Sequence, residues 1–254
     1  FVDHFLVAVY GLDGARRTSP SRIDVAGARA LEIDAAWTGA GYSVLATYER
    51  SRGLGAAETL GVRVELDATG GVVALEALST SVSGMRARAY APDRTWYGIE
   101  TGLFGGLGPL VSIARDGTVT RGPSIDGGAW TFHAGGHSPL GDRHWALASP
   151  AAVPGAPVVI ELDATGAVRS RTPLYDETDY PYGAIAVEST SVVGVVVRRS
   201  WAGGGYWFFR VSGGSVLQRL RLPDAPHGPM FLRHLGDRYA IGWGVFFDEL
   251  VLCP

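Results

Sequence analysis

Three carboxylates and three tyrosines crowd one short segment of the chain, residues 175–182, which reads Tyr-Asp-Glu-Thr-Asp-Tyr-Pro-Tyr. Carboxylates accept hydrogen bonds and attract cations, while a tyrosine ring offers a flat apolar face with a polar end. The segment therefore predicts an acidic, aromatic lip for a sugar, a cation or a peptide, although a solvated polar loop would have the same composition. The candidate ligand contacts are Asp176, Glu177, Asp179, Tyr180 and Tyr182.

A tryptophan in a glycine-rich setting is the second candidate. Trp201 follows the pair Arg198-Arg199 and precedes three consecutive glycines. This setting favours an exposed indole, which would stack on the apolar face of a sugar or on a guanidinium group. We therefore add Trp201 and Arg199 to the candidate ligand contacts. Packing of Trp201 against a neighbouring element is an equally good interpretation, and we expect the other six tryptophans to fill the interior.

Three histidines raise the question of a metal site. His133, His137 and His144 fall within twelve residues, and the first two have the i, i+4 spacing of ligands on a helix. Gly135 and Gly136 stand between them and argue against a helix. We therefore expect no metal site here, and the sequence predicts no cofactor.

The sequence gives little indication of a catalytic site. The chain has neither a Gly-x-Ser-x-Gly nucleophile motif nor a glycine-rich phosphate loop. Glycoside hydrolysis needs two carboxylates roughly 5–10 Å apart, for which segment 175–182 supplies candidates. Asp34 or Glu188 could also serve acid–base chemistry, but no spacing pairs them. Whether the chain is an enzyme stays open at this point, and ligand binding is favoured.

A repeat positions these segments. Turns of the Asp-Gly or Gly-Gly type follow alternating apolar residues at intervals of 54, 49, 47 and 50 residues. Two of them are near copies, Glu-Leu-Asp-Ala-Thr-Gly at 65–70 and at 161–166, which argues against coincidence. Asp-Gly suits a two-residue hairpin, and Asp-Ala-Thr-Gly suits a type I turn followed by a left-handed glycine. The turns begin at Asp13, Asp67, Asp116, Asp163 and Gly213.

Asp-Arg pairs form a second marker with the same period. They precede apolar or aromatic strands at 93–94, 142–143 and 237–238, and we interpret them as hairpins of the scaffold. Each period thus holds four predicted strands, with hairpins after the first and the third. For two periods the predicted strands are 130–134, 144–148, 157–162 and 168–173, then 183–188, 192–198, 206–211 and 215–222.

Four antiparallel strands in a repeat of this length are typical of a β-propeller blade. Over essentially its full length the chain resembles bacterial β-propeller repeat proteins, although it has no WD dipeptide and no kelch glycine pair. The resemblance is one of fold pattern and implies architecture. We therefore expect an all-β fold with a single propeller domain over residues 1–254.

The repeats predict five four-stranded blades. The N-terminal strand, 4–12, would take the third position in a blade that the C-terminal strands 230–235 and 239–245 begin, and this pairing would close the ring. The predicted strand 246–252 competes for that third position. Six blades or an incomplete ring is the alternative.

Antiparallel strands place successive connections at opposite ends of a sheet. The hairpins after the first and third strands are short, whereas the second-to-third loops and the blade-to-blade links are long and varied. Long loops on a rigid scaffold commonly carry binding and catalysis. We therefore place the functional site on the long-loop face around the central channel, with segment 175–182 and the Trp201 loop. The three histidines fall on the short-turn face.

Composition excludes several classes of protein. With 46% hydrophobic residues and a net charge of −3, the chain is expected to fold and has no basic excess for nucleic acid. The best apolar run, Val192 to Val197, is too short to cross a membrane. Cys253 is the only cysteine, which excludes an internal disulfide. All 22 basic residues are arginine, which indicates a GC-rich bacterial genome.

The sequence does not decide the cellular compartment of the protein or the identity of its binding partner. A single cysteine permits the cytoplasm, and a start at Phe1 permits secretion or export to the periplasm after cleavage. The favoured function is binding of a carbohydrate or peptide on the long-loop face. The alternatives are a glycoside hydrolase or lyase that uses carboxylates at the channel, and a non-catalytic accessory or scaffold subunit with a protein partner.

Overall fold

The computed structural model describes most of the chain, and the described residues form strands joined by turns. The described residues are 4–9, 15–51, 57–78, 85–91, 95–101, 106–125, 130–138, 140–150, 156–175, 182–198, 205–222, 230–243 and 246–251. None of these residues belongs to a helix that is long and apolar enough to cross a membrane.

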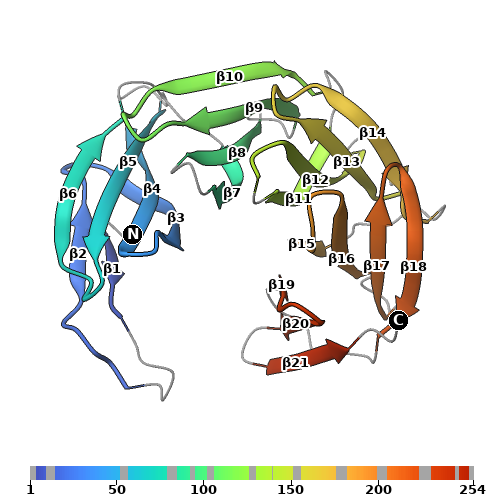
Figure 1. The fold of residues 1–254 in the computed structure, drawn as a ribbon. Helices are drawn as coiled ribbons and strands as arrows, with labels where there is room; N and C mark the ends of the chain where they lie inside the picture. Colours follow the sequence, from blue (N-terminus) through green and yellow to red (C-terminus); the bar gives the residue numbers. More distant parts are fainter. Residues whose placement is uncertain are drawn as a thin grey trace. The chain divides into compact units, whose positions relative to one another are not determined.

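The described strands form six sheets, coloured along the chain in Figure 1. The first pairs β1 (His4–Val7) with β2 (Ser21–Asp24). The second contains β3 (Arg29–Trp37), β4 (Gly41–Ser51), β5 (Ala57–Asp67) and β6 (Val72–Ala77). The third contains β7 (Met85–Tyr90), β8 (Trp96–Thr101), β9 (Leu107–Ile113) and β10 (Val119–Ser124).

The remaining sheets continue this pattern toward the C-terminus. The fourth contains β11 (Trp130–His137), β12 (Arg143–Pro150), β13 (Val158–Asp163) and β14 (Val168–Pro173). The fifth contains β15 (Tyr182–Val187), β16 (Val192–Arg198), β17 (Tyr206–Ser212) and β18 (Ser215–Arg221). The sixth contains β19 (Met230–His234), β20 (Arg238–Trp243) and β21 (Phe246–Val251).

These sheets confirm the all-β class and the four-stranded repeat. In the fourth and fifth sheets the strands follow the predicted ranges closely, and β16 matches its prediction at both ends. The largest difference is at β11, which continues past its predicted end at Ala134 to His137. It continues because Gly135 and Gly136 pair with β12 and do not form a loop.

The repeated Asp-Ala-Thr-Gly turns are built alike. The Oδ1 atom of Asp163 accepts hydrogen bonds from the backbone nitrogens of Thr165 (2.8 Å) and Ala167 (3.1 Å). Gly166 has a φ of 87°, a left-handed conformation that costs glycine little. Asp67 bonds Thr69 and Gly71 in the same way, at 2.8 and 2.9 Å. The predicted turn chemistry is therefore confirmed at both copies.

The chain packs into two compact units. The first comprises Phe1–Met85, Arg94–Trp96 and Ser112–Thr120. Its core joins β1 and β2 to the β3–β6 sheet around residues such as Ile23 and Tyr48. The expectation of a single domain over residues 1–254 stays a prediction.

The second unit comprises Arg86–Asp93, Tyr97–Val111 and Arg121–Pro254. Within it, apolar layers lie between successive sheets. In β16, Val195 packs in the layer shared with the fourth sheet and Val196 in the layer shared with the sixth. Both faces of this strand are therefore buried, which explains its unbroken run of apolar residues.

The chain ends differ from the predicted strand order. The third position of the last sheet belongs to β21, which pairs antiparallel with β20. The N-terminal strand β1 pairs instead with β2. Only residues 244–245 separate β20 from β21, so β21 reaches this position at a small cost in loop entropy. The count of five blades and the closure of the ring stay predictions.

A partly buried polar junction ties the fifth sheet to the sixth. The Glu188 carboxylate accepts hydrogen bonds from the Tyr239 hydroxyl (2.7 Å) and from Nε of Arg210 (2.6 Å). The ring of Tyr239 lies where a side chain at Gly194 would otherwise stand, so a Cβ at that position would clash with it. Gly194 is therefore the residue that lets Tyr239 reach Glu188.

This junction predicts a double-mutant cycle. Gly194→Ala should lower the free energy of unfolding by roughly 1–3 kcal/mol, because the added methyl overpacks the Tyr239 ring. In a Tyr239→Leu background the same substitution should cost at least about 1 kcal/mol less, since the clashing ring is gone. Urea denaturation of the four proteins measures both values. Additive effects of the two substitutions would contradict the junction.

Candidate functional site

The strand register brings the two candidate segments to one end of one sheet. Tyr182 at the start of β15 pairs with Arg198 at the end of β16, and Arg198 pairs with Tyr206 at the start of β17. The connections 176–181 and 199–204 therefore leave the fifth sheet at the same end. Asp176, Glu177, Asp179, Tyr180, Arg199 and Trp201 belong to these connections and lie outside the described residues.

Tyr175 differs from the expectation of an aromatic lip. Its side chain is only 7% exposed and packs beside the ring of Phe209, with ring centroids 6.2 Å apart. The preceding residue, Leu174, is buried and donates a backbone hydrogen bond of 2.9 Å to the carbonyl of Pro157. Tyr175 is thus a core residue that fixes the start of the acidic segment.

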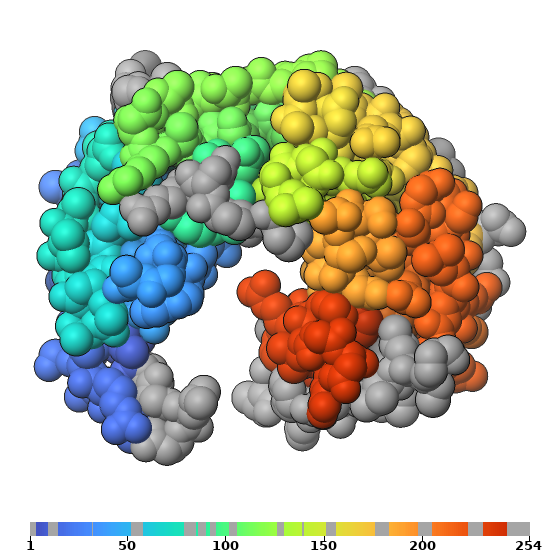
Figure 2. Space-filling view, viewed as in Figure 1, coloured from blue at the N-terminus to red at the C-terminus, as the bar shows by residue number. Residues whose placement is uncertain are grey.

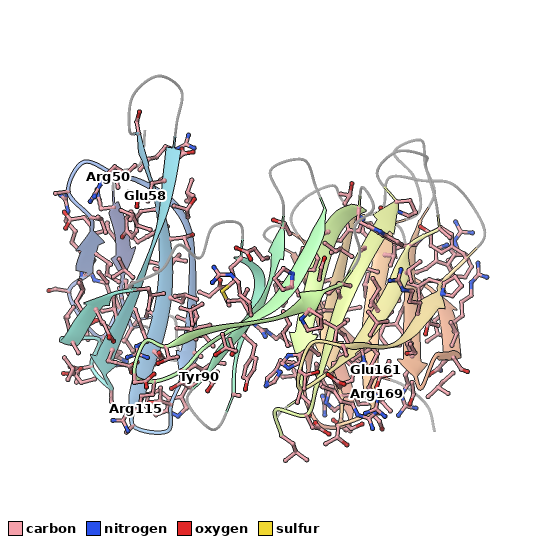
Figure 3. All side chains as sticks on the ribbon, turned by 90° about the horizontal axis from the view of Figure 1, so that it is seen from above. Arg50, Glu58, Tyr90, Arg115, Glu161 and Arg169 are labelled. Carbon is pink, nitrogen blue, oxygen red and sulfur yellow. The ribbon has the colours of Figure 1, made fainter. Side chains whose placement is uncertain are left out.

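The opposite ends of the sheets carry the short turns, as predicted. In the first unit, Figure 3 shows Arg50 and Glu58 at the end of β4 and β5 that carries the long connection, and Arg115 at the other end. At the turns, the Thr165 side chain and backbone donors hold the pKa of Asp163 below its usual value. Thr69 and its neighbours do the same for Asp67. These carboxylates accept hydrogen bonds within their own turns and stabilise them.

Two of the three candidate histidines are in contact with each other. His137 and His144 are cross-strand partners of β11 and β12, and their Nδ1 atoms are 2.6 Å apart. Two lone pairs would repel at this distance, so one Nδ1 donates its hydrogen to the other. Tyr97 stacks on His137, with ring centroids 4.2 Å apart. The three rings thus form a compact aromatic cluster.

Burial keeps His144 uncharged at neutral pH. His144 is almost completely buried, and burial together with the neighbouring His137 lowers its pKa from 6.5 to about 3, against the smaller opposite effects of Asp142 and Asp163. Its Nε2 atom is buried and has no hydrogen-bond partner among the described residues. The two rings can therefore share a hydrogen bond at neutral pH, and His144 is a poor proton acceptor.

His133 lies apart from the other two. A β-bulge between Phe132 and Ala134 shifts the register at His133, so the two-residue alternation that would align it with His137 is broken. Its Nε2 lies 2.8 Å from the hydroxyl of Ser149, and burial lowers its pKa to about 4. Within the described ranges, no three or more histidine, cysteine, aspartate or glutamate side chains gather into a metal site.

A small cavity borders the histidine pair. Tyr97, Ile99, Leu110, His144 and Trp145 are among its lining residues. It has room for little more than one water molecule, which excludes a sugar ring or a peptide side chain of any size.

Glu188 does not have the raised pKa that a general acid needs. Burial raises its pKa, but the hydrogen bonds from Arg210 and Tyr239 and the charge of Arg210 outweigh burial and lower it overall. A general acid needs the opposite shift. The carboxylate is therefore a structural group of the sheet junction.

The chain is similar to known proteins in fold, not in sequence. No protein-family model matches it, and no curated protein matches its sequence. A solved glucose dehydrogenase is similar with a TM-score of 0.61 and 10% identity, over 97% of this chain and 90% of that one. The soluble aldose sugar dehydrogenase of Escherichia coli has a TM-score of 0.57 and 11% identity, over 96% and 88%.

A third solved structure extends this likeness. A puromycin-hydrolyzing peptidase of Mycobacterium tuberculosis has a TM-score of 0.61 and 15% identity over 99% of this chain. The chain spans only 46% of the length of that peptidase. At these identities the likeness shows the fold alone. Together with the repeated sheets, it confirms the resemblance to β-propeller proteins, and the chain has an all-β propeller fold.

The buried histidine pair predicts a loss of stability in acid. An unfolded chain binds a proton at His144 below about pH 6.5, whereas the folded chain does not until about pH 3. The free energy of unfolding should therefore fall as the pH drops from 6.5. His144→Gln should remove roughly 1 kcal/mol per pH unit of that slope between pH 6 and 5. Denaturation at several pH values measures the slope for both proteins. An NMR titration of the His144 ring with a midpoint near 6.5 would contradict the account.

Proposed function

We propose that this chain is a ligand-binding propeller that takes a carbohydrate or a peptide where residues 176–181 and 199–204 leave the fifth sheet. The observation that carries the proposal is the register of Tyr182, Arg198 and Tyr206, which brings both segments to the same end of adjacent strands. Two segments that are separate in the sequence, one acidic and aromatic and one with Arg199 and Trp201, are therefore joined to neighbouring strand ends.

The chemistry of the two segments fits such a ligand. Asp176, Glu177 and Asp179 provide acceptors for sugar hydroxyls or for peptide donors. Tyr180, Tyr182 and Trp201 provide flat apolar faces, on which a sugar ring or a peptide side chain would stack. Arg199 would bind a carboxylate or orient an acidic residue of the site.

The platform beneath these segments is rigid. Val195, Val196 and Val197 of β16 are fully buried, and Ala184 and Ala186 of β15 are buried beside them. Tyr175 fixes the chain just before the acidic segment, and buried Tyr206 fixes it just after the Trp201 loop. A site held between fixed ends loses less conformational entropy on binding.

The described residues at the other end of the sheets offer less to an organic ligand. There the turn aspartates are engaged by their own backbone, and the histidine cavity holds little more than one water. Glucose dehydrogenase and aldose sugar dehydrogenase share the fold and are named for sugars, so the fold is compatible with a sugar ligand. The assignment to this chain rests on its own two segments.

The proposal predicts the effect of removing the Trp201 indole. Trp201→Ala should weaken binding of a ligand found on glycan and peptide arrays by roughly 10- to 100-fold, because a stacked aromatic anchor carries much of the binding energy. Calorimetric titration measures the affinity.

A matched control removes a tryptophan of the second sheet whose exposure the structure describes. The expectation that Trp37 fills the interior is wrong. Trp37 is 54% exposed and packs edge-on against Tyr42 beside a short hairpin of the second sheet. Trp37→Ala should leave the affinity unchanged. Equal losses in both variants, no loss in Trp201→Ala, or no binding to either array would overturn the proposal.

A further inference from the structure

The edge strand β6 exposes apolar side chains and carries no arginine or proline, unlike the edge strands of three other sheets. β6 is the last strand of the second sheet and pairs with β5 on one side. Its side chains Val72, Val73 and Leu75 are 47%, 68% and 53% exposed. Figure 2 shows this strand, in turquoise, at the molecular surface. An edge strand with exposed apolar side chains is a template for pairing with another strand.

The corresponding strands of three other sheets are protected. Edge strands are commonly kept from pairing by charged side chains and by proline, which lacks a backbone donor. β10, β14 and β18 occupy the same edge position in their sheets. Strand β10 carries Arg121 and Pro123. Strand β14 carries Arg169, Arg171 and Pro173, and strand β18 carries Arg219 and Arg221. β6 reads Val-Val-Ala-Leu-Glu-Ala and contains neither arginine nor proline.

The single charge of β6 is neutralised within its own unit. The Glu76 carboxylate accepts a hydrogen bond of 2.5 Å from Nη2 of Arg63. Arg63 is buried and also donates from Nη1 to the carbonyl of Ala114, at 2.7 Å. The guanidinium is therefore fixed in place and pairs the one acidic side chain of the strand. The Glu76 side chain is 44% exposed, and Arg63 also lies 3.8 Å from Glu65. The stretch Val72–Leu75 of β6 is uncharged and exposes apolar side chains.

We propose that β6 is a docking strand for the β6 of a second copy of this chain, with the two strands antiparallel about a two-fold axis. Such an interface uses the same patch on both copies, so the patch must be compatible with itself. An arginine-bearing edge would repel its own copy, whereas β6 brings apolar side chains together on both faces of the new sheet. A cationic partner would meet only Glu76, which Arg63 already pairs.

The size of the strand limits the strength of this dimer. A stable interface buries about 800 Å² on each partner, and a six-residue strand supplies only part of that. We therefore expect a dissociation constant in the micromolar range, on the order of 10 µM or weaker. The proposal concerns the first unit and does not depend on the ligand site of the fifth sheet.

Sedimentation velocity of the 254-residue chain over roughly 1 to 500 µM tests the proposal. The chain should shift from monomer to dimer across this range. Val73→Arg and Leu75→Lys should each raise the dissociation constant at least tenfold, because they place like charges at the interface. In the wild type, the β6 amides should exchange hydrogen more slowly at high concentration.

Leu217→Arg is the matched control, because Leu217 is 55% exposed on the arginine-bearing strand β18. It should leave the dissociation constant unchanged. The substituted side chains are exposed, so the melting temperature should stay within a few degrees of the wild type, which separates lost pairing from lost folding. A chain that stays monomeric throughout, or that dimerises equally well with Arg at position 73, would overturn the proposal.

Discussion

The reversal of direction between neighbouring antiparallel strands is the constraint on which the structure depends. Each strand of the fifth sheet pairs with its neighbour in the chain, so successive connections leave at opposite ends. This rule collects compact turns such as 163–166 at one end of a sheet and the longer connections at the other. The division into a scaffold end and a candidate binding end follows from backbone pairing, before any side chain is considered.

Packing between sheets makes this arrangement firm enough to support a site. The valines of β16 fill apolar layers on both of its faces, and Gly194 leaves space for the Tyr239 ring to reach Glu188. Glu188 shows how position decides chemistry. The sequence suggested it as a catalytic acid or base, but Arg210 and Tyr239 hold it as a charged structural group.

Local signals predicted much of this fold. The Asp-Ala-Thr-Gly turn specifies its own hydrogen bonds, and a continuous apolar run located β16 at both ends. Features that depend on tertiary context were missed. Tyr175 was expected in a surface lip but is buried, because a tyrosine side chain suits either environment. The bulge at His133 has no sequence signature. The pairing of His137 with His144 was accessible, because the hairpin that closes between Ser138 and Arg143 makes them cross-strand partners.

The candidate site was predicted from residue types, and its six loop residues lie outside the described residues, so the strand register carries the proposal. Hydrogen exchange with and without a bound glycan or peptide tests it most directly. The account predicts slower exchange in residues 176–181 and 199–204 when the ligand is present. Protection confined to the short turns, such as 67–70 and 163–166, would contradict it.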